Sequence, residues 1–113
     1  MRFGSEEHKE LFCRFFIETH KLFRPEELPW PDLSQSTVGK LASFPIWDYA
    51  VHTERQVSNK LNAYANEEQD APLKEALGLQ AYEEGRHADT LKCFLKRYNI
   101  PFNKIPDNPY HLI

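Results

Sequence analysis

The sequence contains few of the residues and runs that mark several protein classes. Only 4 glycines occur among its 113 residues, which favours helices over a turn-rich all-β fold. No stretch approaches the roughly 18 consecutive apolar residues of a membrane-spanning helix, and the N-terminus carries Glu6, Glu7 and Glu10, unlike a signal peptide. A soluble, cytoplasmic protein without membrane contact is therefore expected.

Basic runs and cysteine pairs are also lacking. The 14 basic and 17 acidic residues give a net charge of -3, and no basic run could follow a phosphate backbone, so nucleic acid is not an expected partner. Cys13 and Cys93 make no pair at metal-binding or redox spacing, and we expect reduced structural thiols. With 41% hydrophobic residues, the chain predicts one ordered domain of modest size.

The first part of the chain, residues 1–24, predicts a helix that ends near Phe23. Ser5 is its expected N-cap, because acidic residues that complement the helix dipole follow it. The apolar face of this helix is strongly aromatic, and we expect it to pack in the core; a surface for an apolar substrate or a partner is the alternative. Its residues are Leu11, Phe12, Phe15, Phe16, Leu22 and Phe23.

Residues 25–44 predict a proline-rich connector that includes one short helix, because closely spaced prolines prevent a continuous helix. Trp30 is expected to fasten this connector to the helices. Ser36 is the expected N-cap of the short helix, which runs through Ala42, and Ser43 the expected N-cap of the long helix that follows.

Residues 45–99 predict a hairpin of two long helices. The first runs from about Pro45 to Glu67, and the second begins after Asp70, an expected N-cap, and ends near Tyr98. Residues 100–113 predict an extended tail. The expected fold is all-α.

The second helix of this hairpin carries Glu84 and His87, three residues apart and therefore on one face, where they can bind one metal ion. Chance alone yields about half of one such match in this composition, so the setting matters more than the motif. Apolar residues flank the pair along the same stripe. Glu54 is the only charged residue on the apolar face of the first helix.

Glu54 and Glu84 each lie about 15 residues from a turn centred near residue 69. At about 1.5 Å per residue, both reach a level roughly 22 Å from the turn, so the hairpin predicts a metal site of Glu54, Glu84 and His87. Gln80 and Tyr49 lie one turn from these ligands, where they would hydrogen-bond to them; ordinary helix packing is the alternative.

The segment Glu83-Glu84-Gly85-Arg86-His87-Ala88-Asp89-Thr90-Leu91 resembles the helix signature of ferritin-like di-iron carboxylate proteins. It is similar to the Glu-Glu-Asn-Arg-His-Gly-Asp-Leu-Leu string of soluble acyl-carrier desaturases, and rubrerythrins carry related strings. The resemblance implies that Glu54 is a terminal ligand, that Glu84 bridges two metals and that His87 completes the set. It also implies iron or manganese as cofactor, and an oxidoreductase that uses dioxygen or peroxide with an electron donor and a small-molecule substrate.

A complete site of that superfamily has a second set of ligands, and this sequence contains only one Glu-x-x-His. Either two copies dimerise face to face, or the chain is the N-terminal half of a longer protein; a homodimer is expected under both. A metal-free helical dimerisation or binding module is the alternative function, and iron storage is a third.

Other charged residues have simpler interpretations. If Glu84 and His87 form a solvated, salt-bridged face without metal, Arg55 and Arg86 are the expected neutralising cations. Glu83 is expected to be a solvated charge. The remaining histidines, His8, His20, His52 and His111, are expected on the surface.

Overall fold

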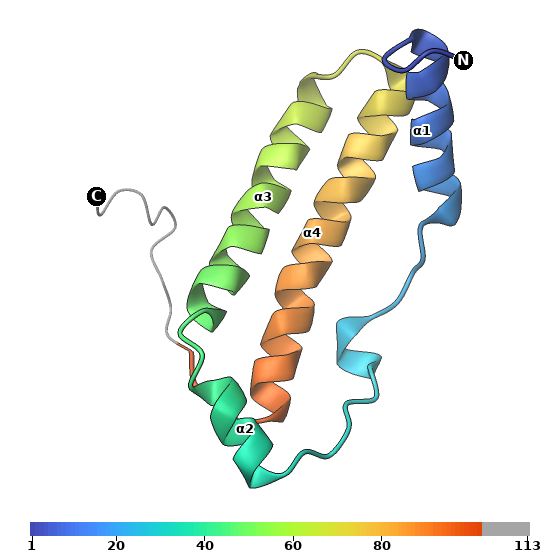
Figure 1. Ribbon diagram of the computed structural model, residues 1–113. Helices are drawn as coiled ribbons and strands as arrows, with labels where there is room; N and C mark the ends of the chain where they lie inside the picture. Colours follow the sequence, from blue (N-terminus) through green and yellow to red (C-terminus); the bar gives the residue numbers. More distant parts are fainter. Residues whose placement is uncertain (103–113) are drawn as a thin grey trace.

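The computed structural model describes residues 1–102, and their fold is all-α, as predicted (Figure 1). The elements in chain order are α1 (Glu6–Thr19), the 3-10 helix η1 (Pro25–Glu27), α2 (Gln35–Ala42), α3 (Trp47–Glu67) and α4 (Ala71–Arg97). Most of the predicted tail, with His111, lies outside the described residues. Within residues 1–102, no helix is long and apolar enough to cross a membrane.

Helix α4 is the element on which the others pack. It forms its largest interface with α3, to which it is joined by the short turn around Gln69, and α1 and η1 also pack on it. In Figure 1, α4 lies between α3 on one side and α1 on the other. The predicted helical hairpin is therefore α3 and α4.

Two of the predicted caps are present. The Ser5 hydroxyl accepts a hydrogen bond from the His8 backbone N–H at the start of α1. Asp70 accepts one from the Leu73 N–H at the start of α4, and its other oxygen lies 3.1 Å from Nζ of Lys9. One carboxylate therefore caps α4 and also links the first turn of α1 to it.

The first helix is shorter than predicted. It ends at Thr19 instead of near Phe23, because the following residues are extended and bind to α4. Arg86 donates a hydrogen bond to the Lys21 carbonyl, and its guanidinium lies 3.8 Å from the centre of the Phe23 ring. These contacts replace the helical hydrogen bonds that local sequence favours.

Two predicted caps in the connector were wrong. Ser34, not Ser36, caps α2 through a hydrogen bond from Thr37 N–H. Ser43 ends α2, where its hydroxyl donates to the Lys40 carbonyl, and α3 begins only at Trp47.

The second hairpin helix ends within a residue or two of the predicted position. Asn99 has a left-handed backbone with φ of 53°, a conformation that asparagine tolerates better than most residues. The N–H groups of Asn99 and Ile100 bind the carbonyls of Lys96 and Leu95, which closes the helix with a Schellman motif.

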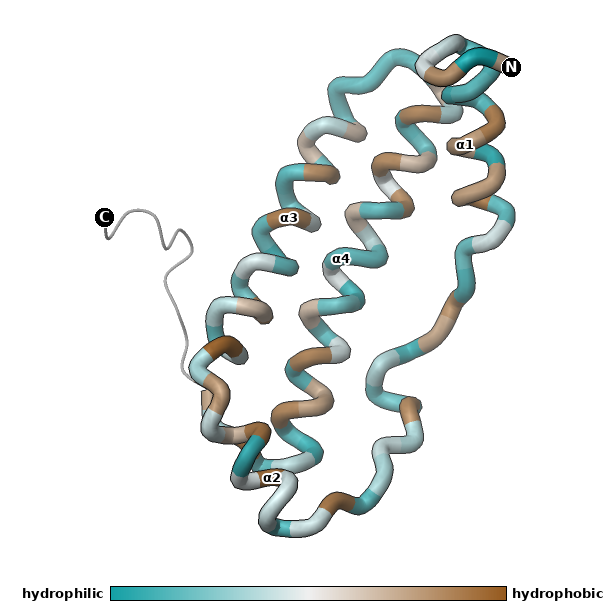
Figure 2. Tube along the Cα trace, viewed as in Figure 1, coloured by the Kyte–Doolittle hydropathy of each residue, from teal (hydrophilic) through white to brown (hydrophobic). Residues whose placement is uncertain are grey.

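The hydrophobic core lies at one end of the hairpin, next to α2. Leu95 is fully buried there, and Trp30 packs its ring against Phe94 and Tyr98, which confirms that Trp30 fastens the connector. Burying a leucine side chain is worth about 1.5–3 kcal/mol. This core fixes the start of α3 against the end of α4. The middle of the hairpin, farther from α2, is more polar (Figure 2).

The aromatic face of α1 does not pack as predicted. Phe12 and Phe15 are each 68% exposed, and Leu22, beyond the end of the helix, is 80% exposed. Cys13 is instead the residue of α1 that is buried, and both Cys13 and Cys93 are free thiols, as expected. The helix contacts only α4, so its opposite side remains uncovered within residues 1–102.

Candidate metal centre

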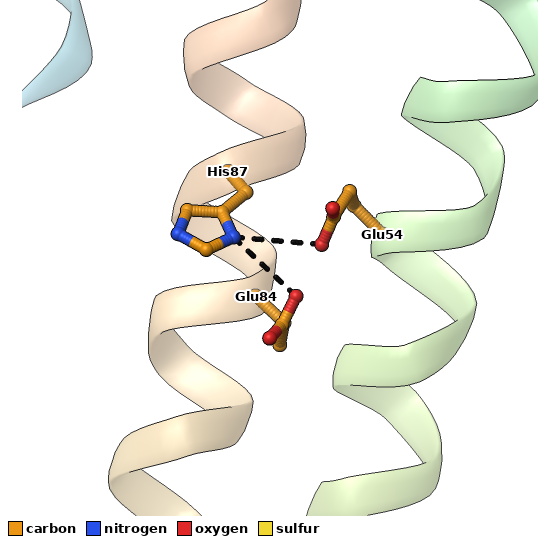
Figure 3. Close-up of side chains that lie close together, drawn as sticks. All are labelled: Glu54, Glu84 and His87. Carbon is orange, nitrogen blue, oxygen red and sulfur yellow. Dashed lines mark ion pairs between the residues drawn. The ribbon is translucent and has the colours of Figure 1, made fainter.

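The structure brings together the three residues predicted as metal ligands (Figure 3). Glu54 comes from the middle of α3, and Glu84 and His87 come from successive turns of α4. Each offers one ligand atom, and these atoms all lie within 4.8 Å of one another. Glu54 and Glu84 lie at the same height above the turn because both helices rise by the same distance per residue.

His87 forms ion pairs with both glutamates, at distances longer than a direct hydrogen bond and close to those between neighbouring ligands of one ion. Nδ1 of His87 lies 3.5 Å from Oε2 of Glu54 and 3.4 Å from Oε2 of Glu84. A charge-assisted hydrogen bond between an imidazolium and a carboxylate is shorter, at about 2.7–2.9 Å. Adjacent ligands that are each about 2.1 Å from one ion lie roughly 3.0–3.4 Å apart.

Within residues 1–102, the carboxylate of Glu54 lacks a hydrogen-bond partner at one of its oxygens. Its Oε2 is buried and has no hydrogen-bond partner among the described residues. The adjacent carboxyl group of Glu84, with its negative charge, and burial raise the pKa of Glu54, against a smaller lowering effect of His87. Without a metal, the pair therefore favours retention of a proton; a cation would favour the ionised form.

The arginines expected to neutralise these glutamates bind elsewhere. Arg55 forms an ion pair with Asp89 at 2.8 Å. Arg86 lies 3.8 Å from the carboxylate of Glu83. The expected neutralising role of Arg55 and Arg86 was therefore wrong, but the alternative of a salt-bridged face is not, because both glutamates form ion pairs with His87.

One side of the cluster is open. The side chain of His87 is 53% exposed, whereas those of Glu54 and Glu84 are 32% and 21% exposed. The second ring nitrogen of His87 points away from both glutamates (Figure 3). Three protein ligands leave coordination positions for further ligands, and the exposed side gives access to them.

The two residues predicted to support the ligands are both exposed. Gln80 lies one turn before Glu84 on α4, and Tyr49 lies near the start of α3 with 54% of its surface exposed. Their role in orienting metal ligands stays a prediction.

Sequence reasoning missed a second polar cluster on α4. His20 was expected on the surface and Glu83 in solvent, yet Nδ1 of His20 lies 2.8 Å from Oε2 of Glu83. Their side chains are only 9% and 22% exposed. The pair joins the end of α1 to α4, and no local spacing could have indicated it because 63 residues separate the partners.

The other histidines have different environments. His8 accepts a hydrogen bond from the Gly4 N–H through Nδ1. His52 was expected on the surface, but it is half-buried, and its Nε2 is buried without a hydrogen-bond partner among the described residues. The expectation for His52 was therefore wrong.

No protein-family model, curated protein or solved structure matches the chain. The family resemblance therefore rests on the segment from Glu83 to Leu91, and the candidate metal site rests on the geometry of Glu54, Glu84 and His87.

Proposed function

We propose that this chain is a ferritin-like metal-binding protein in which Glu54, Glu84 and His87 hold one iron or manganese ion. The observation that carries the proposal is the buried Oε2 of Glu54, which lacks a hydrogen-bond partner and lies 3.5 Å from a histidine ring nitrogen. Two carboxylates and an imidazole are ligands that suit iron and manganese.

We propose further that a second copy of the chain completes the centre. Val57 and Tyr64 lie at helical spacing from Glu54 along α3 and are 36% and 63% exposed. An exposed apolar stripe that passes through the ligand position supports packing of this face against another helical pair. Two hairpins that meet there would supply two sets of three ligands.

The bound metals would supply redox chemistry with dioxygen or peroxide. The role of the protein is to bind and orient. To hold an ion, Glu54 and Glu84 would have to be ionised and His87 would have to be a neutral imidazole, because metal ligands bind in their deprotonated forms. The exposed side of His87 leaves a path for a small substrate and for an electron donor.

Metal content tests the proposal. Protein loaded anaerobically with ferrous iron and then desalted should retain about one iron per chain and run as a dimer. Glu84→Gln, which keeps the shape but removes the charge, should lose the iron while it keeps its helical circular dichroism. Glu75→Gln, an exposed glutamate on the same helix, is the matched control and should retain the iron. Iron retained by Glu84→Gln, or none in the wild type, would contradict the proposal.

A metal-free interaction module is the second candidate, favoured by the exposed aromatic residues of α1. Phe12 and Phe15 lie on the side of α1 that no described element covers. This candidate predicts a dimer that lacks metal and dissociates when both phenylalanines are replaced by serine. The metal-binding proposal predicts that the same double variant retains its iron.

A further inference from the structure

Glycine is unusual in the middle of a long helix, because it loses more conformational freedom than other residues. Helix α4 contains two, Gly78 and Gly85. A Cβ atom added at Gly78 would meet no atom within 4 Å apart from its chain neighbours and the nearby backbone of its own helix. A Cβ atom added at Gly85 would lie 3.1 Å from both Nη1 of Arg55 and Oγ of Ser58. Of the two, only Gly85 lies where a side chain would meet its neighbours closer than ordinary van der Waals contact.

Ser58 is the neighbour that cannot easily move. It is buried, and its hydroxyl donates a hydrogen bond of 2.6 Å to the Ala81 carbonyl of α4. Arg55 is 43% exposed and more adaptable; it donates to the Gly85 carbonyl at 3.3 Å and pairs with Asp89. These bonds join α3 to three successive turns of α4, at Ala81, Gly85 and Asp89.

The residues that make these contacts stand next to the proposed metal ligands in the sequence. Gly85 directly follows Glu84, and Arg55 directly follows Glu54. Ser58 lies one turn beyond Glu54. The bonds to Ala81 and Gly85 therefore fix both the separation and the register of the helices at the level where the ligands meet. A slip of one residue would move Glu54 by about 1.5 Å along the helix and turn its side chain away.

We propose that Gly85 and Ser58 are positioning residues of the metal site. Because Gly85 has no side chain, Ser58 packs directly on the α4 backbone. The resulting close approach sets the distance between Glu54 on one helix and His87 on the other. The inference rests on the proposed metal site and adds the residues that hold its two halves in register.

The test compares five proteins: wild type, Gly85→Ala, Gly78→Ala, Ser58→Ala and the double variant with Ser58→Ala and Gly85→Ala. Each is titrated with Mn²⁺, and free Mn²⁺ is measured by electron paramagnetic resonance. Gly85→Ala should weaken Mn²⁺ binding about tenfold or more, the loss typical of disturbed outer-shell residues. Gly78→Ala, the matched control, should bind Mn²⁺ as the wild type does.

The double variant separates positioning from general damage. With Ser58 Oγ gone, the nearest Ser58 atom to the added methyl group is the β-carbon, at an ordinary 3.8 Å. The double variant should therefore bind Mn²⁺ to within about twofold of Ser58→Ala alone. Thermal unfolding without metal should show the same pattern: Gly85→Ala should destabilise the wild type more than it destabilises Ser58→Ala. This comparison tests the packing independently of metal binding.

The outcomes distinguish the two proposals. If the wild type binds Mn²⁺ and folded Gly85→Ala binds it equally well, the positioning role is wrong while the metal site stands. Failure of Ser58→Ala to rescue Gly85→Ala would also overturn the positioning role. If the wild type binds no Mn²⁺, the proposed function fails and the positioning role fails with it.

Discussion

The Oε2 atom of Glu54 and the Nδ1 atom of His87 lie 3.5 Å apart across the interface of α3 and α4. The glutamate oxygen is buried and has no hydrogen-bond partner within residues 1–102. Glu84 approaches the same nitrogen from the turn below, at 3.4 Å. Two carboxyl groups therefore share one imidazole, and the protonation of Glu54 should govern both stability and metal affinity.

The pH dependence of stability should depend on Glu54. Its pKa in the folded chain is raised above its ordinary value of 4.5, so the folded state holds more protons than the unfolded state in the range just above that value. The stability that the folded chain gains from protonated Glu54 is present below about pH 4.5 and is lost as pH rises through the raised pKa. Glu54→Gln cannot ionise and should remove this loss, so this variant should be more stable than the wild type at neutral pH without metal.

Urea denaturation of the metal-free wild type and Glu54→Gln at a series of pH values checks this prediction. The difference between the two proteins is the relevant quantity, because all other carboxyl groups titrate in both. A difference that stays constant from about pH 4.5 to about pH 7 would show that Glu54 does not carry the effect.

Asp70 should act mainly as a helix cap. Asp70→Ala removes both the bond to the Leu73 N–H and the ion pair with Lys9, and should cost about 1 kcal/mol. Asp70→Asn keeps a capping oxygen and loses only the charge, and it should cost less than about half of that because ion pairs near the surface contribute little. Thermal unfolding measures the stability of both variants. Equal losses of stability in Asp70→Ala and Asp70→Asn would assign the effect to the ion pair with Lys9 instead of the cap.

The His20 and Glu83 contact should hold the end of α1 on α4. His20→Ala removes a partly buried hydrogen bond of 2.8 Å and should cost about 1–2 kcal/mol. Amide hydrogen exchange should increase in α1 while α3 remains protected. His8→Ala, which removes an exposed bond from the Gly4 N–H and a ring contact with Phe3, but no contact with α4, is the control. Equal effects of the two substitutions would contradict an anchoring role for His20.

The level of Glu54 and Glu84 could be predicted because two helices joined by a short turn advance at the same rise per residue. The caps Ser5 and Asp70 were recognisable for a similar reason, since each acts within its own first turn. Local rules therefore gave the hairpin and the position of its polar cluster.

Features that depend on contacts between distant segments could not be predicted in the same way. The end of α1 depends on Arg86, which binds the Lys21 carbonyl 65 residues away. The requirement for Gly85 depends on Ser58, a buried residue of the opposite helix. The periodicity of α1 indicated an apolar face but could not indicate whether another element covers it.

The most direct test of the metal site is an anomalous difference map, measured at the iron absorption edge, from crystals grown anaerobically with ferrous iron. Iron bound as proposed would give a peak in each chain about 2.0–2.3 Å from one oxygen of Glu54, one oxygen of Glu84 and Nδ1 of His87. An ordered site without such a peak, or iron bound only at other residues, would contradict the proposed centre.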